Sequence, residues 1–185
     1  MNGKKTPNES RYRMKKPMLW VVIGCVVLLV GCKSAANDKT GRSEPRPTSD
    51  YPLFFVSEYD PTRDAASDLV NAVAEARQSG RRILLDIGGD WCGWCHILDE
   101  FIVQHSDINQ ALRQNFVIMK VNYSQENFND AFLQQFPAAA GYPHFYILES
   151  DGTFLHSQNT AELEEGQSYN PAVFMAFIEQ WKPQS

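Results

Sequence analysis

The hydrophobic pattern separates an N-terminal part from a region, beginning at residue 51, in which strand-like and helix-like spacings alternate. Apolar residues fill most of 83–87, which predicts a buried strand, and they recur at helical spacing from Ile97 to Ile102. In chain order we expect a strand or packed lead-in at 51–59, a helix at 65–79, a strand at 83–87, a helix at 91–102, a helix from 106, a strand at 116–121, a helix at 126–136, a hairpin at 144–148 and 153–156, and a helix at 171–181.

This order predicts an α/β fold. Its first half is typical of a βαβ unit with parallel strands, and its second half of a ββα unit with antiparallel strands. We therefore expect residues 51–185 to form one domain with a central mixed β-sheet and helices on both faces. The helix from 106 is an extra helix after the one at 91–102. Residues 159–169 are polar and acidic, which favours a solvated loop.

The first 31 residues have the features of a secretory signal peptide. Residues 1–17 are polar and basic, and 18–30 form an apolar stretch, shorter than the ~20 residues that a membrane-spanning helix needs. The stretch leads into Leu29-Val30-Gly31-Cys32, which resembles a bacterial lipobox, and the resemblance implies that Cys32 is the acylated N-terminus of the mature protein. The alternative is an uncleaved anchor. Residues 32–50 lack apolar periodicity and predict a flexible tether.

The distribution of charge argues against nucleic-acid binding. The chain has 17 Lys and Arg against 22 Asp and Glu, a net charge of −5. Six of the basic residues but one acidic residue lie in residues 1–31, so the remainder carries a net charge of −10. An acidic domain without a basic stripe does not favour a polyanion.

Of the four cysteines, two lie in the predicted signal region and two, Cys92 and Cys95, are candidates for a reactive pair. Cys25 lies within the signal peptide and Cys32 at its end, so no framework of structural disulfides is expected. Cys92 and Cys95 stand where the strand at 83–87 gives way to a helix, whose first turn has unpaired N–H groups and the positive end of the helix dipole. That environment favours a Cys92 thiolate, with Cys95 one turn away. The pair indicates a redox dithiol, which calls for no cofactor or metal.

Three features together resemble the thioredoxin superfamily over about residues 60–182. They are Trp91-Cys92 with Cys95 after a buried strand, Asp86 six residues before Cys92, and Tyr142-Pro143 at the start of the hairpin. The likeness is to bacterial extracytoplasmic thiol:disulfide interchange proteins, a subgroup that the extra helix also fits. It implies a thioredoxin-like fold.

The resemblance also implies roles for individual residues. Cys92 would be the attacking thiolate and Cys95 the resolving thiol, with Asp86 as a buried general base for Cys95. Pro143 would follow a cis peptide bond and face the dithiol. The residues implied in substrate binding are Trp91, Gly93, Trp94, Tyr142 and Pro143, with the Tyr142 backbone pairing with an extended peptide.

Some positions depart from thioredoxin. Gly93-Trp94 replaces a Gly-Pro dipeptide, so thioredoxin's own reduction potential does not transfer. Trp94 is either a substrate contact or a side chain of the helix turn, and His96 either tunes the thiols or is an ordinary surface histidine. Gly88-Gly89 replaces a bulky aromatic residue and a small one, which predicts a more open floor beneath the site.

Three alternatives compete with the dithiol. The CGWCH segment at 92–96 also fits c-type haem attachment, with Met119 or His144 as the second axial ligand, and the two cysteines with His96 and His105 could bind zinc. The strand-rich pattern with its matched Asp86 and Pro143 disfavours both. The third alternative is a binding or chaperone module that keeps the fold without catalysis.

The resemblance implies a thiol–disulfide oxidoreductase that reduces or exchanges disulfides in extracytoplasmic client proteins, with reduction favoured over oxidation. Such a reductase needs electrons, and we expect a separate membrane thiol reductant as the donor. We expect a monomer without a nucleic-acid partner, held on the lipid bilayer of a bacterial cell envelope through Cys32 and facing the periplasm. Lys33 after the cysteine weakly favours the outer membrane.

Overall fold

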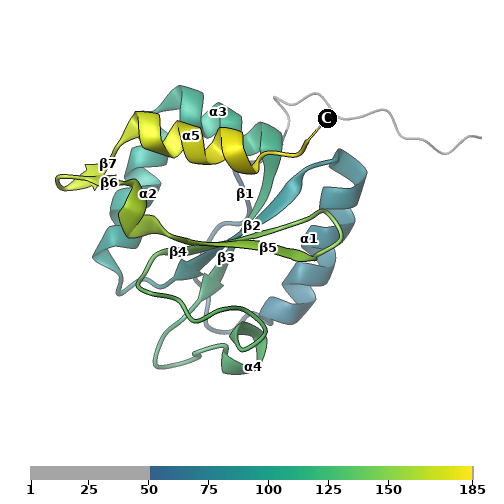
Figure 1. Ribbon diagram of the computed structural model, residues 1–185. Helices are drawn as coiled ribbons and strands as arrows, with labels where there is room; N and C mark the ends of the chain where they lie inside the picture. Colours follow the sequence, from purple (N-terminus) through teal and green to yellow (C-terminus); the bar gives the residue numbers. More distant parts are fainter. Residues whose placement is uncertain (1–50, 185) are drawn as a thin grey trace, which may run out of the picture. The chain divides into compact units, whose positions relative to one another are not determined.

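The computed structural model describes residues 51–184, which form a five-stranded mixed sheet between two layers of helices (Figure 1). The predicted signal peptide, lipid-bearing Cys32 and tether lie outside the described residues. In spatial order the strands are β1 (Phe54–Val56), β3 (Phe116–Asn122), β2 (Arg82–Gly88), β4 (His144–Leu148) and β5 (Phe154–Asn159). β1 and β2 pair with β3 in parallel, whereas the β2–β4 and β4–β5 pairs are antiparallel. The predicted mixed sheet is confirmed.

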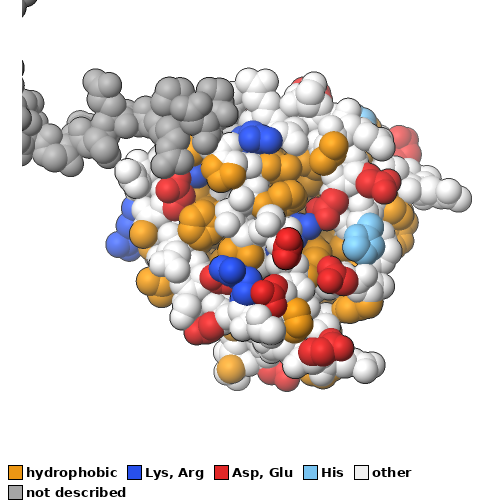
Figure 2. Space-filling view, turned by 180° about the vertical axis from the view of Figure 1, so that it is seen from behind, with side chains coloured by type: hydrophobic (Ala, Val, Ile, Leu, Met, Phe, Trp, Pro, Cys, Tyr) orange, Lys and Arg blue, Asp and Glu red, His pale blue; other side chains and the backbone are white. Residues whose placement is uncertain are grey.

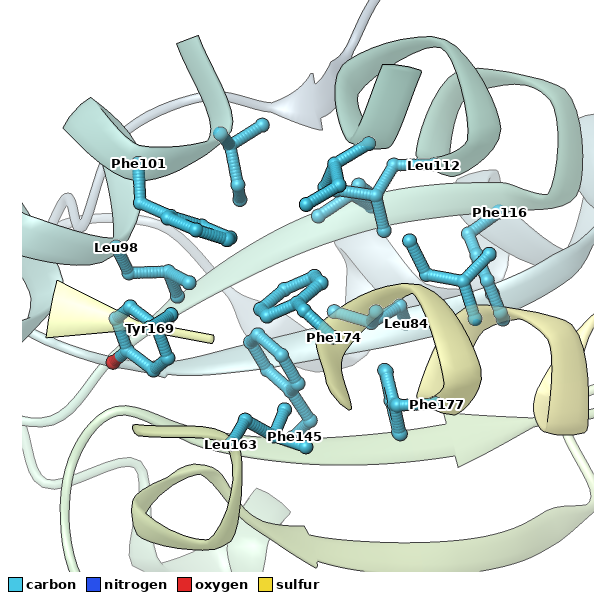
Figure 3. Close-up of a cluster of buried hydrophobic side chains, with 14 of the residues drawn as sticks. Leu84, Leu98, Phe101, Leu112, Phe116, Phe145, Leu163, Tyr169, Phe174 and Phe177 are labelled. Atoms are coloured by element: carbon cyan, nitrogen blue, oxygen red, sulfur yellow. The ribbon is translucent and has the colours of Figure 1, made fainter. Parts of the chain in front are cut away.

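Alternation along the strands sends side chains into two cores. One core joins Leu84 and Phe145 to helices α2 (Gly93–Gln104), α3 (Ser106–Asn115) and α5 (Pro171–Trp181), and Figure 3 shows its side chains meeting across these elements. The other core joins Leu85 and Tyr146 to α1 (Ala65–Ser79) and the short α4 (Asp130–Leu133). Both sheet faces are therefore buried, which is why β2 is a nearly continuous apolar run. The extra helix α3 is confirmed.

Local signals fix the helix ends close to the expected positions. The Asp64 carboxylate accepts a hydrogen bond from the Ala66 N–H and caps α1, and Gly80, with a φ of 70°, ends it. Asn170 caps α5 through the N–H groups of Ala172 and Val173. No helix within residues 51–184 is long and apolar enough to cross a membrane.

The expected helix at 126–136 is wrong except for the single turn of α4. Asparagine side chains hold the preceding segment in another conformation: Asn127 Oδ1 accepts from the Asn129 N–H, and Asn129 Nδ2 donates to the Asn122 carbonyl. Asn129 itself has a φ of 50°. Such local hydrogen bonds compete with helix formation, so apolar spacing alone overestimated this helix.

The expected solvated loop at 159–169 is also wrong. It contains a 3₁₀ turn, η2 (Thr160–Leu163), and a small hairpin of β6 (Glu164–Glu165) and β7 (Ser168–Tyr169). Leu163 and Tyr169 are buried in the core beside α2 and α5, as Figure 3 shows. These two apolar anchors are too sparse to give a periodic signal, although they suffice to fold the segment onto the domain.

Candidate active site

The cysteine pair lies at the junction between β2 and α2. Cys92 is the N-cap residue of α2, and its Sγ accepts a hydrogen bond from the Cys95 backbone N–H at 3.2 Å. The two sulfurs form a disulfide, with Cα atoms 5.3 Å apart. Cys92 is 3% exposed and Cys95 is fully buried, so an incoming group meets Cys92 first. The unpaired N–H groups of the first turn stabilise a Cys92 thiolate once the disulfide is reduced.

The floor beneath the disulfide is filled, contrary to the expectation from Gly88-Gly89. A Cβ on Gly88 would lie 2.5 Å from Cys95 Sγ and 3.0 Å from the Tyr59 hydroxyl, and a Cβ on Gly89 would lie 2.5 Å from Trp91 Nε1. The missing side chains therefore make room for the sulfur and for two aromatic rings, Tyr59 from the segment after β1 and Trp91 from the turn itself. The expected open floor is wrong because sequence comparison at two positions does not reveal what fills the space.

Asp86 projects from the middle of β2 into the protein interior. It is 2% exposed, and burial raises the pKa of its carboxyl to about 7. The neighbouring Lys120 and Tyr59 lower this pKa, and Asp99 raises it further. Lys120 lies opposite Asp86 on β3, but its Nζ binds Asp99 Oδ2 at 2.6 Å, so its charge is shared between two carboxylates.

Aromatic rings form a continuous surface on one side of the disulfide. We call Trp91, Tyr142, Tyr123 and Phe128 the aromatic surface; in this order each ring contacts the next, with centroids 4.7–5.7 Å apart. Trp91 is 58% exposed and Phe128 41% exposed, and the Trp91 indole N–H donates to the Tyr123 carbonyl at 2.7 Å. A cleft of about 430 Å³ lies between Trp91 and residues 123–128.

The other expected site residues lie around the same pair. The Tyr142–Pro143 peptide bond is cis, as expected, and the Pro143 carbonyl accepts from Thr160 Oγ1. Gly93 is exposed with open space at its Cα. The half-buried Trp94 packs edge-on against Tyr169, which anchors it to β7. The exposed His96 bonds the Asp90 carbonyl through Nε2 at 2.9 Å.

The ligand sets of the haem and zinc alternatives are not assembled in residues 51–184. Met119 and His144 lie on the α1 face of the sheet, away from the cysteines, with Met119 fully buried and His144 against Tyr146. His105 follows α2 at its far end, with Nδ1 on the Phe101 carbonyl. No group of three His, Cys, Asp or Glu side chains in this part of the chain is arranged to hold a metal ion.

Sequence reasoning missed the contributions of Tyr59, Tyr123, Phe128 and Tyr169. All four come from loops, strand ends or the small hairpin, and they reach the site by tertiary packing. The presence of aromatic residues next to predicted turns was the single available signal, and it does not say which of them converge.

Parts of the sequence match a protein-family model and known proteins. Residues 64–150 match a protein-family model described as thioredoxin-like. Over 118 residues, 64% of this chain, it is 24% identical to the thiol:disulfide interchange protein DsbD of Klebsiella pneumoniae, and over 76 residues, 39% of this chain, it is 30% identical to human Spermatogenesis-associated protein 20. The chain spans 18% and 10% of the lengths of these relatives.

Solved structures give the same fold. The protein is similar to a disulphide isomerase from Xylella fastidiosa Temecula1, with a TM-score of 0.57 and 21% identity over 66% of this chain and 94% of that one. It is also similar to the C-terminal domain of Neisseria meningitidis DsbD in the oxidised form, with a TM-score of 0.50 and 19% identity over 68% of this chain and all of that one. The strand order, the cysteine pair at the start of α2 and these matches establish that the protein has a thioredoxin-like fold, with residues 64–150 matching the thioredoxin-like family model.

Proposed function

We propose that the protein is a thiol–disulfide oxidoreductase that reduces or exchanges disulfides in extracytoplasmic client proteins. The observation that carries the proposal is the placement of Cys92 as the N-cap of α2, with Cys95 buried one turn on. A slightly exposed sulfur at a helix N-terminus beside a fully buried one suits two-step thiol exchange, because the first can attack a client disulfide and the second can resolve the product. The activity named for DsbD supports this reaction class.

In the proposed reaction the Cys92 thiolate attacks one sulfur of a client disulfide, forming a mixed disulfide and releasing the other client sulfur as a thiolate. Cys95 then loses its proton and attacks Cys92 Sγ. The Cys92–Cys95 disulfide forms, the remaining client sulfur leaves as a thiolate, and two electrons have passed to the client. Asp86 is the proposed acceptor of the Cys95 proton, since burial holds its pKa at about 7, near the working pH.

Reduction or exchange is the proposed direction, because Gly93 and an apolar Trp94 stand between the cysteines instead of the histidine found in strong oxidants. A catalytic reductase must be re-reduced after each cycle, and we assign that role to a separate membrane thiol reductant. We further propose that residues 1–31 are a signal peptide, that Cys32 is acylated, and that residues 32–50 tether a monomeric domain on the periplasmic side of the cell envelope.

The aromatic surface is the proposed contact for clients. It lies beside Cys92, carries two of the exposed large apolar side chains, and opens into the cleft at residues 123–128. Exposed aromatic rings held by their neighbours contribute contact area at little entropic cost, which suits apolar residues flanking a client cysteine. The backbone of Tyr142 is the proposed partner for an extended client segment.

Replacing one cysteine at a time tests the assigned roles. Cys95→Ser should accumulate mixed disulfides with client proteins, because Cys92 still attacks but nothing resolves the product. Cys92→Ser should accumulate none. Non-reducing gels of cells that express each variant measure this, and equal trapping by both variants would contradict the assignment.

A redox titration in thiol/disulfide buffers, followed by the fluorescence of Trp91 and Trp94, tests the direction. We expect a midpoint near or below about −230 mV, on the thioredoxin and glutaredoxin side of the scale. A midpoint near about −120 mV would make the protein an oxidant and reverse the electron flow.

Asp86 should make the folded protein less stable as the pH rises. Its carboxyl has a pKa of about 7 when folded and near 3.8 when unfolded, so the folded state binds the proton more tightly and stability falls between about pH 4 and pH 7. Relative to wild type, Asp86→Asn should gain up to about 4 kcal/mol between pH 4 and pH 8.

Urea unfolding of the oxidised protein at several pH values measures this, with Glu100→Gln on the exposed face of α2 as the matched control. A difference between Asp86→Asn and wild type that stays constant with pH would show that the carboxyl does not titrate in this range.

Truncation of the aromatic surface should weaken client binding and leave the sulfur chemistry intact. Phe128→Ala should raise KM for a disulfide-containing peptide with apolar flanking residues by roughly threefold to tenfold, with reduction of glutathione disulfide unchanged. Val70→Ala, which truncates an exposed side chain on α1, is the control. An equal loss with both substrates would place Phe128 outside client recognition.

A further inference from the structure

Tyr59 is a buried aromatic residue that neither the motif nor the proposed reaction assigns. It follows β1 in the chain, is 4% exposed, and forms a small cluster with Cys92 and Cys95. The segment that carries it follows β1, the edge strand beside β3, so the fold brings Tyr59 to the cysteines from outside the junction of β2 and α2.

The space above Gly88 gives the geometry. The point where a Gly88 Cβ would stand is 2.5 Å from Cys95 Sγ and 3.0 Å from both Cζ and the hydroxyl of Tyr59. The phenol of Tyr59 and the sulfur of Cys95 therefore both lie over the last residue of β2. The absence of a Gly88 side chain is what allows both groups to approach this point.

The same hydroxyl interacts with Asp86. The Tyr59 hydroxyl and Asp86 Oδ1 are both buried, and neither has a hydrogen-bond partner of good geometry in the described part of the chain. Tyr59 lowers the pKa of the Asp86 carboxyl, and Asp86 together with burial raises the pKa of the phenol. A buried donor and a buried acceptor without other partners are each stabilised by pairing with the other.

We propose that Tyr59 is a positioning residue for the resolving step, in which its hydroxyl donates a hydrogen bond to the Asp86 carboxylate and directs the other carboxylate oxygen toward Cys95. This inference rests on the proposed function. With Tyr59 in place, Asp86 accepts the proton from the Cys95 S–H as the Cys95 sulfur attacks Cys92 Sγ. The S–S bond to the client breaks, the client sulfur leaves with the electron pair, and Asp86 holds the proton.

A polar recess beside Tyr59 is the exit that this inference assigns to the proton. It has a volume of about 410 Å³, and Tyr59 forms part of its wall. Lys120 Nζ lies 4.7 Å from the centre of the Tyr59 ring, which places the cation against the ring face. The titratable groups that face Asp86 are Tyr59, Lys120, Asp99 and Tyr169, and the recess adds Glu58, Asp60, Asp90 and His96.

The test separates the attacking step from the resolving step. The full chain in detergent, with Cys25 and Cys32 replaced by serine, is reduced and mixed with 5,5′-dithiobis(2-nitrobenzoate). Attack by Cys92 releases one nitrothiobenzoate, and resolution by Cys95 releases the second. Attack is bimolecular and resolution is intramolecular, so with the reagent in enough excess the phase at 412 nm whose rate no longer depends on reagent concentration reports the step that Asp86 serves. The rates of both phases are measured from pH 5 to pH 9.

Tyr59→Phe keeps the ring and removes the donor. Loss of a hydrogen bond to the ionised carboxyl raises its pKa, so the midpoint of the resolving phase should move up by about one pH unit, and the rate at pH 6 should fall roughly tenfold. The attacking phase should change less than about twofold, and the two proteins should converge near pH 9. In an Asp86→Asn background, Tyr59→Phe should have no effect on the pH profile.

Tyr169→Phe is the matched control, since it removes another buried hydroxyl without a partner in the described chain, from a ring packed near the site. An unshifted profile in Tyr59→Phe, or an equal shift in Tyr169→Phe, would overturn the role of Tyr59 and leave the proposed function standing. Persistence of the Tyr59→Phe effect without Asp86 would overturn it as well. Release of a single nitrothiobenzoate by the wild-type site would instead refute the dithiol mechanism, and with it this inference.

Discussion

The close approach of Cys95 and Tyr59 to the backbone of Gly88 is the constraint on which the site depends. β2 must end in a residue without a side chain, because a Cβ there would overlap the sulfur. The Gly88 carbonyl accepts the Tyr123 N–H at 2.6 Å, which ties this strand end to the loop that holds Trp91. A single atom added at Gly88 would therefore displace the start of α2 and the aromatic surface together.

Asp86 sets the electrostatics of the same place at a cost in stability. A carboxyl on a buried strand is stabilised in its neutral form, and Lys120 offsets this effect incompletely because Asp99 shares its charge. A full ion pair with Lys120 would stabilise the fold more, and it would also hold the carboxylate at a pKa too low to take a proton from a thiol. The fold therefore keeps the Asp86 carboxyl, which lowers the stability of the folded protein, at a position where an intermediate pKa serves the proposed reaction.

Periodicity and motifs were enough to predict the framework and the cysteine pair. The apolar runs at 83–87 and 116–121 match β2 and β3, and the cysteine spacing predicted the pair that forms the disulfide. The residues that surround the pair were not predictable in the same way. Tyr59 and Tyr169 reach the site from segments with no strong pattern, and their roles come from contacts across the sheet and the small hairpin.

The wrong prediction of a helix at 126–136 also arose because contacts between side chains and backbone are not visible in the apolar pattern. Its apolar residues are spaced for a helix, but the asparagine hydrogen bonds described above hold residues 123–129 as a loop after β3, and this loop exposes Phe128 beside Trp91. A continuous helix there would have carried Phe128 on a regular surface instead of at the mouth of the cleft. The local competition between side-chain and backbone hydrogen bonds is thus what shapes one wall of the site.

The proposed reaction uses the two sides of the disulfide for different steps: the exchange of sulfur on one side and the transfer of the proton on the other. The aromatic surface and the slightly exposed Cys92 form the proposed client side, whereas Cys95, Asp86 and Tyr59 are buried, with Tyr59 forming part of the wall of the polar recess. A client can therefore exchange with Cys92 without reaching the proton acceptor, and the proton can leave Cys95 without crossing the client interface. Separating the path of the sulfur from the path of the proton lets resolution proceed while the client still covers the site.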